Sequence, residues 1–231
     1  MRVLKFFVTI LLLLSCATLF AQDLPKFGEL VKVYEQLAGQ CWVASYANMS
    51  CMVPTGRLAS YIDSNFEKTI ASYKKSSYLT IEDKKSLLNY YKNIGHIDDI
   101  YLNNLMFGVG LAKNTKEEIC VYAGCFFYNK VYNTNRLTEL ERAKDVIESA
   151  ILPILQKAGT YITNISHQYI MIGMGYITKS PYEGENGGAV YCIIPTKDIL
   201  EFNSLEITSN ELIRNSRVYI KDVGEIKLIS I

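Results

Sequence analysis

The sequence predicts an α+β domain with a helical N-terminal part and a C-terminal antiparallel β-sheet. Apolar residues recur at helical spacing between Pro54 and Asn93, and again between Leu137 and Lys157. The last third of the chain instead holds short apolar runs separated by residues rich in glycine, proline and asparagine, which is typical of strands and their turns. The 231 residues are enough for a domain with a substantial core.

Residues 1–21 are predicted to be a signal peptide, which leaves 22–231 as the mature domain. Arg2 and Lys5 precede an apolar stretch that is too short and wrongly flanked to span a membrane, and small residues follow it. A lipoprotein anchored at Cys16 is the alternative. The apolar residues that continue after Cys16 favour an unanchored product, exported to the periplasm or secreted.

The composition argues against several classes of partner. With 24 basic and 23 acidic residues, the formal net charge of +1 gives no support for binding to nucleic acid or to an anionic membrane. No membrane span is expected once the signal is removed. The chain has only two histidines, and its cysteine spacings do not match a zinc site, so neither a metal nor a cofactor is expected.

The cysteine count indicates one free thiol. If Cys16 leaves with the signal, an odd number of the six cysteines remains, which allows at most two disulfides. Cys41 is expected to stay free. Cys120 and Cys125 are close enough in sequence to pair locally, but several of these residues can equally be small buried hydrophobes, and the connectivity stays open.

Local signals set the expected helix boundaries. Thr80 is expected to cap a helix with Asp83 in its first turn, and Gly95 to end that helix. In the helix over 137–157, Pro153 should cause a kink or a break. Gly159 is expected to stop it.

The C-terminal third is expected to form the sheet. The run 167–177 is apolar on both faces, which predicts a central strand covered on both sides. The glycine- and asparagine-rich stretch 180–188 is predicted to be a hairpin connection. Further strands are expected at 119–122 and 125–128 (or an aromatic-rich loop there), 160–163, 189–195, 217–220 and 225–231.

One short stretch carries the chemistry. Cys41 is followed by Trp42, the only tryptophan, and then by small and apolar residues. Gly39 and Gln40 lie just ahead, which predicts that Cys41 stands in the first turn of a buried helix. Unpaired backbone N–H groups and the helix dipole favour a thiolate there, and the thiolate is the nucleophilic form.

The run from Gln36 through Cys41 and Trp42 to Ser45 resembles the nucleophile segment of papain-like cysteine peptidases. The closest likeness is to a compact bacterial branch with a Gln…Cys-Trp-Ala-Ala-Ser signature. The resemblance covers this segment and little else. It implies a papain-like fold, a cleft between the Cys41 helix and the sheet, a peptide or protein substrate, and no cofactor.

His167 is the predicted general base. A thiol nucleophile needs a group that accepts its proton, and histidine suits that role near neutral pH. His96, the other histidine, follows a helix beside acidic residues and is interpreted as a surface loop residue. His167 opens a buried strand, which is where the base stands in the family that the chain resembles.

The resemblance implies two further site residues. Relatives build the oxyanion hole from the cysteine N–H and a glutamine side chain, at a position where this chain has Glu35, so the next residue, Gln36, is the candidate. Relatives also place an asparagine or aspartate on the strand after the histidine, where this chain has Ile194. Asp198 is the predicted substitute. Asn186 and Asn164 are the alternatives.

Two functions follow from these residues. Cys41 and His167 favour an exported cysteine hydrolase, most simply a peptidase. Glu35 and Ile194 favour a papain-fold pseudoenzyme that binds a peptide or a surface partner without turnover. Few residues precede Gln36 after the signal, so no inhibitory pro-domain is expected.

Overall fold

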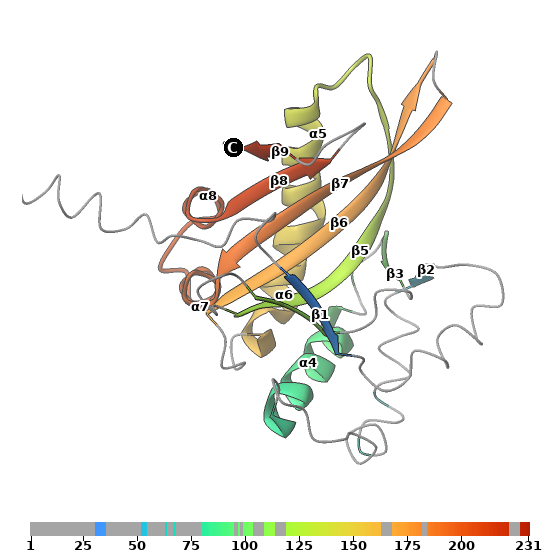
Figure 1. Ribbon diagram of the computed structural model, residues 1–231. Coiled ribbons are helices and arrows are strands. Elements are labelled where there is room, and N and C mark those ends of the chain that lie inside the picture. The colour runs from blue at the N-terminus through green and yellow to red at the C-terminus, as the bar shows by residue number, and fades with distance from the viewer. Residues whose placement is uncertain are drawn as a thin grey trace, which may run out of the picture.

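The computed structural model combines helices with one sheet, in agreement with the expected α+β class (Figure 1). It describes residues 31–35, 52–54, 63, 67, 80–94, 97, 99–103, 109–113, 119–162, 168–181, 184–221 and 227–231. Within these residues the sheet has nine strands. The strands are β1 Val31–Glu35, β2 Met52–Pro54, β3 Ile100–Asn103, β4 Val109–Lys113, β5 Ile119–Asn133, β6 Tyr169–Ser180, β7 Gly184–Pro195, β8 Arg217–Lys221 and β9 Lys227–Ile229. The helices are α4 Ile81–Asn93, α5 Glu139–Val146, the π-helical segment η4 Ile147–Ile151, α6 Leu152–Ile162, α7 Thr196–Asn203 and α8 Ser209–Arg214.

The sheet is mixed rather than purely antiparallel. Its main path runs β1-β4-β5-β6-β7-β8-β9, and β3 pairs with both β2 and β5. Every described pair is antiparallel except β5 with β6. The expected antiparallel sheet is therefore wrong at this pair. The reason is that the helical segment between β5 and β6 carries the chain back along the sheet, so both strands start at the same end.

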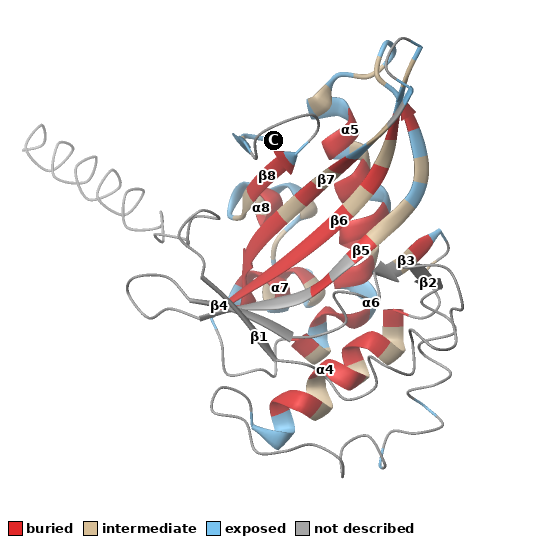
Figure 2. Ribbon diagram, turned by 45° about the vertical axis from the view of Figure 1, so that its right-hand side comes forward, coloured by how far each residue is buried: buried red, intermediate tan, exposed pale blue. Residues whose placement is uncertain are grey.

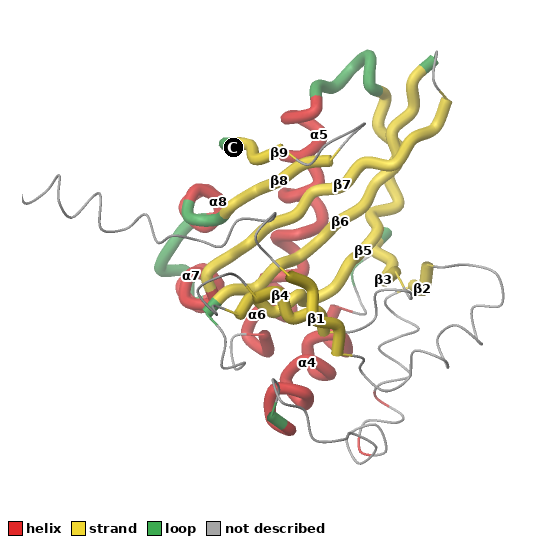
Figure 3. Tube along the Cα trace, in the orientation of Figure 1, coloured by secondary structure: helices red, strands yellow, loops and turns green. Residues whose placement is uncertain are grey.

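Strand β6 lies in the middle of the sheet and is buried on both faces. Its first six residues are all buried, and Ile170 and Ile172 on one face belong to the main hydrophobic core. Tyr169 and Met171 on the opposite face are also buried (Figure 2). This confirms the predicted central strand. Figure 3 shows that β6 and β7 continue as a long hairpin, whose tip projects beyond the part of β7 that pairs with β8.

The helices α5, η4 and α6 form one rod against one face of the sheet (Figure 1). The rod buries a stripe of apolar residues at helical spacing, as the periodicity predicted, except at Leu140, which is exposed. The fully buried members of that stripe are Ala143, Val146, Ala150, Ile151, Ile154, Leu155, Ala158 and Ile162. Burying such side chains contributes roughly 1.5–3 kcal/mol for each large one, so this face anchors the core.

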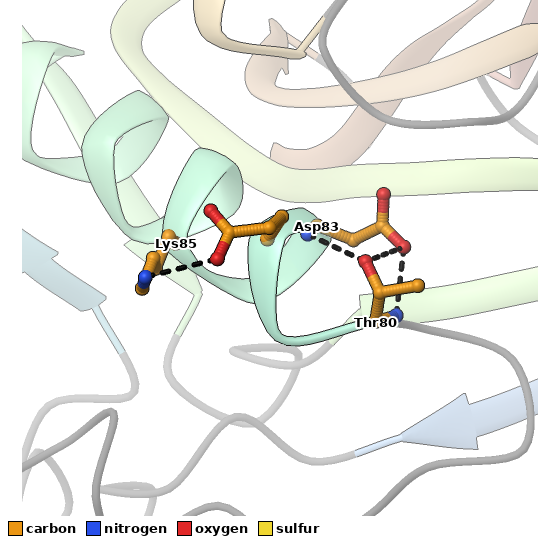
Figure 4. A network of polar contacts seen from close by, with 4 residues as sticks. Thr80, Asp83 and Lys85 are labelled. Carbon is orange, nitrogen blue, oxygen red and sulfur yellow. Dashed lines mark hydrogen bonds and ion pairs between the residues drawn. The ribbon is translucent and has the colours of Figure 1, made fainter.

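Thr80 caps helix α4, as predicted. The Thr80 hydroxyl accepts from the Asp83 N–H at 3.1 Å, and the Asp83 carboxylate accepts from the Thr80 N–H at 2.7 Å (Figure 4). This capping box satisfies two backbone donors that a helix start leaves unpaired. The same arrangement begins α5 at Thr138 and α8 at Thr208. The helix α4 ends at Asn93, and Gly95 lies outside the described residues.

Pro153 does not break its helix. The turn before it is η4, in which the Leu152 N–H donates to the Ile147 carbonyl. A proline removes one helical hydrogen bond and its ring crowds the carbonyl four residues earlier. A π-turn is wider by one residue, so it makes room for the ring. The expected kink or break is therefore a local widening of the rod.

The predicted helix stop at Gly159 is wrong. Helix α6 continues to Ile162, so residues 160–162, which were expected to begin a strand, are helical. A Cβ on Gly159 would lie 2.8 Å from Asn203 Nδ2 and 2.8 Å from Ile199 Cγ2, both on α7. Glycine stands here because it lets α7 approach closely, not because it ends the helix.

The two short strands expected between residues 119 and 128 are one strand, β5. Gly124 has φ of +121°, and the pairing with β6 shifts register between Tyr122 and Cys125. A glycine in this conformation is typical of a bulge, which interrupts the pattern of a strand without ending it.

Candidate active site

Most of the predicted catalytic residues lie outside the described part of the chain. Cys41, His167 and Gln36 are among them, as is the alternative Asn164. Asp198 is described. Around the expected site, the structure describes the strand that follows His167 in the sequence and the helix that carries Asp198.

The start of β6 is joined to the start of α7. Tyr169 pairs with Pro195, the last residue of β7, and α7 begins at the next residue. The Thr196 N–H donates to the Gln168 carbonyl at 2.8 Å. Gln168 directly follows His167 in the sequence. The first turn of α7 therefore lies beside the backbone that leads to the predicted base.

Asp198 stands in that first turn and is buried. Only 9% of its surface is exposed. The turn expected after Pro195 is in fact a helix, and an acidic residue in its first turn is favoured by the helix dipole. Burial raises the pKa of Asp198; the hydrogen bond from the Asn215 side chain and the charge of Lys197 oppose this rise, and Glu201 adds to it.

Ile194 stands where the resemblance to papain-like peptidases leads one to expect a polar residue. It is fully buried, pairs with Ile170 across the strands and belongs to the main core. A polar side chain at this position would be costly to bury without a hydrogen-bond partner. Position 194 therefore does not supply the orienting group that the resemblance implies.

Asn186 is at the wrong end of the hairpin for that role. It pairs with Thr178, whereas the start of β6 pairs with Pro195. Nine strand positions separate the two ends, which corresponds to about 30 Å at roughly 3.3 Å per residue. Asn186 therefore lies far from the start of β6, the strand that follows His167 in the sequence.

Cys192 is not a nucleophile. It lies fully buried on β7, has no disulfide, and burial raises its pKa to about 12. Its thiol is therefore protonated at neutral pH and acts as a small hydrophobe, which is the alternative that the sequence left open. The side chains of Cys120 and Cys125 are outside the described residues.

A polar cluster that the sequence did not reveal joins β5 to α5. Lys130 Nζ lies 2.7 Å from Asp145 Oδ2, and the buried Tyr132 hydroxyl donates to the same carboxylate. Burial alone would raise the pKa of Asp145, but the hydrogen bonds from Lys130 and Tyr132 outweigh it and lower that pKa. No sequence motif links residues on a strand and a helix at this spacing.

Comparison of the chain with protein-family models, with curated proteins and with solved structures found no match. The described residues contain no group of acidic, histidine or cysteine side chains able to hold a metal ion. Among the same residues, no helix combines the length and the apolar character needed to cross a bilayer.

Proposed function

We propose that this chain is an exported, papain-like cysteine hydrolase, most simply a peptidase. The observation that carries the proposal is the Cys41-Trp42 segment together with His167 at the entrance to a central strand. The bond from Thr196 to Gln168 supports a third member, since it joins the first turn of α7, which carries Asp198, to the residue that follows His167 in the sequence.

The proposed reaction assigns the proton transfers to His167, the nucleophilic attack to Cys41 and part of the oxyanion hole to Gln36. His167 takes the proton of Cys41, and the thiolate attacks the carbonyl carbon of the scissile bond. The oxyanion that forms is held by the Cys41 N–H and by Gln36, and such preorganised donors are each worth roughly 3 kcal/mol in the transition state. The amine leaves with a proton from His167. Water, deprotonated by His167, then hydrolyses the thioester and restores the thiol.

Asp198 would act as the orienting residue. A buried carboxylate that accepts from the imidazole Nδ1–H holds the ring in the tautomer that catalysis needs. In the structure its carboxylate already accepts from Asn215, and a carboxylate has room for more than one donor.

The second candidate function is a papain-fold binding module without turnover. The buried Ile194 favours it, since the strand lacks the polar residue that relatives use to orient the histidine. The hydrogen bond from Asn215 to Asp198 also favours it, because it gives that carboxylate a purely structural partner.

Covalent labelling distinguishes the two. The full chain is treated with a peptidyl electrophile that reacts only with activated thiols, and the modified residue is mapped by mass spectrometry. The hydrolase predicts one label per chain at Cys41, lost in Cys41→Ser and in His167→Ala. Cys192→Ala is the matched control and should label as the unmodified protein does, because that buried thiol is not ionised. If the folded protein takes no label at Cys41, the hydrolase proposal fails and the binding module is the remaining candidate.

A further inference from the structure

A cavity lies where the π-helical segment meets α8. Its volume is about 270 Å³, close to the lower end of the range for small-molecule sites. The rod contributes Ile147, Glu148 and Leu152, and α8 contributes Asn210 and Ile213. π-turns are rare in proteins, and those that occur are frequently at functional sites. Because η4 lines a cavity, this part of the fold is a candidate binding site.

The cavity has an apolar side and a polar side, and Ser209, Asn210, Lys144 and Glu148 form the polar side. Ile147, Leu152 and Ile213 line it and each exposes 8% of its surface or less. Lys144 and Glu148 also line it, and both are exposed. A lining with separate apolar and polar sides suits a small amphipathic molecule, because polar groups fix its orientation while the apolar side contacts its hydrocarbon part.

Two charged side chains at the rim, Lys144 and Glu148, have opposite signs and are not paired with each other. Lys144 and Glu148 are one helical turn apart, a spacing that commonly gives an ion pair. Within the described residues neither forms an ion pair, whereas Lys197 and Glu201, at the same spacing on α7, do so at 3.2 Å. The segment η4 begins between Lys144 and Glu148, and its wider turn changes the geometry of that spacing.

From the wall and the unpaired charges we infer that the cavity binds a small zwitterion with an apolar side chain, such as a free branched-chain amino acid. Its carboxylate would meet Lys144, its ammonium group would meet Glu148, and its side chain would contact Ile147 and Ile213. Side chains one turn apart have Cβ atoms about 5–6 Å from each other, which suits a ligand whose two charges are attached to one carbon. This inference does not depend on the proposed hydrolase activity.

The test is a titration of the full chain with L-leucine, followed through the isoleucine methyl resonances. We expect saturable shifts at Ile147 and Ile213 with Kd of about 1 mM or tighter. Glycine, which keeps both charges but lacks the apolar side chain, should bind at least roughly tenfold more weakly. No saturation by roughly 20 mM L-leucine would overturn the inference.

Charge-matched variants and ligands identify the contacts. Lys144→Gln and Glu148→Gln should each weaken L-leucine about two- to fivefold, as expected for exposed charges. The amine 3-methylbutylamine lacks the carboxylate, so its affinity for the unmodified protein should be lower than that of L-leucine. Lys144→Gln should leave the affinity for this amine unchanged. Arg214→Gln, on α8 outside the cavity lining, is the control and should change nothing. The inference would be contradicted if all three variants lost the same affinity for L-leucine. It would also be contradicted if Lys144→Gln weakened the binding of the amine as much as that of L-leucine.

Discussion

Single residues in this protein depart from what their positions favour, and Leu205 is the clearest case. It follows α7 in a Schellman motif, in which the Leu205 N–H donates to Phe202 and the Glu206 N–H donates to Glu201. Its φ is +64° and 90% of its surface is exposed. Glycine is the usual residue here, because a side chain in this left-handed region costs about 1–2 kcal/mol.

Leu205→Gly should therefore stabilise the protein. The relief of backbone strain exceeds the larger entropy that glycine has in the unfolded chain, so we expect a gain of about 0.5–1 kcal/mol in the free energy of unfolding. Denaturant titration measures it. The matched control is Leu200→Gly, at an exposed position inside α7, which should destabilise by about 1 kcal/mol. A loss of stability in Leu205→Gly would refute this reading of the motif.

Asp198 allows stability and function to be separated. Because burial raises its pKa, the ionised carboxylate costs folding free energy, and this cost falls as the pH drops through the raised folded value. Asp198→Asn should then leave the free energy of unfolding at neutral pH unchanged or slightly higher. In the hydrolase the same variant should slow the labelling of Cys41 by orders of magnitude, since tautomer control of His167 is lost. Unchanged labelling would exclude Asp198 from the site.

The hydrogen bond from Tyr132 to Asp145 should stabilise the protein more than the ion pair between Lys130 and Asp145 does. Lys130 and Asp145 are both about a third or more exposed, so Asp145→Asn, which keeps an acceptor, should cost less than about 1 kcal/mol. Asp145→Ala leaves the buried Tyr132 hydroxyl without this acceptor and should cost about 1–3 kcal/mol. Thermal unfolding of the two variants checks the order, and the reverse order would contradict it.

The same cluster sets a pH window. The pKa of Asp145 in the folded protein is lowered from 3.8. Its contribution to the free energy of unfolding is therefore present above 3.8 and is lost as the pH falls through the pKa of the folded state. The pKa of Lys130 in the folded protein is raised from 10.5. Its contribution to the free energy of unfolding is therefore present below 10.5 and is lost as the pH rises through the pKa of the folded state. Between these limits the effect of Asp145→Ala should not vary with pH.

At the scale of elements, the contact between α6 and α7 decides how Gly159 behaves. Alanine inside a helix is normally better than glycine by about 1 kcal/mol. Gly159→Ala should nevertheless destabilise by about 1–3 kcal/mol, because its Cβ would overlap Asn203 and the buried Ile199. Gly187→Ala is the control, since a Cβ there meets nothing within 4 Å. Stabilisation by Gly159→Ala would show that the two helices are not packed as described.

Elements with a local signal were predictable, and elements set by distant contacts were not. Thr80 and Asp83 form their box within one turn, so the start of α4 could be predicted from four residues. Thr138 and Thr208 carry the same signal, and the helix that follows Thr208 was missed although it could have been found. Gly159 could not be interpreted correctly from sequence, because its role depends on a helix 40 residues further along the chain.

At the scale of the whole molecule, the α+β class and the central strand were predictable, and the topology was not. The run that forms β6 is apolar at every position of its buried half, a signal that needs no knowledge of neighbours. The parallel pairing of β5 with β6 depends on where the intervening rod returns the chain, which no local pattern encodes. The candidate site is predicted from the Cys41 segment, and only its Asp198 side is among the described residues.

The most direct test of the proposed hydrolase is the rate at which Cys41 is carboxymethylated as a function of pH. Only the thiolate reacts, so the profile reports the pKa of Cys41. A nucleophile paired with His167 predicts fast modification with an apparent pKa well below the usual value of about 8.5, and a return to that value or above in His167→Ala. A Cys41 that titrates at about 8.5 or higher in both proteins would contradict the proposal.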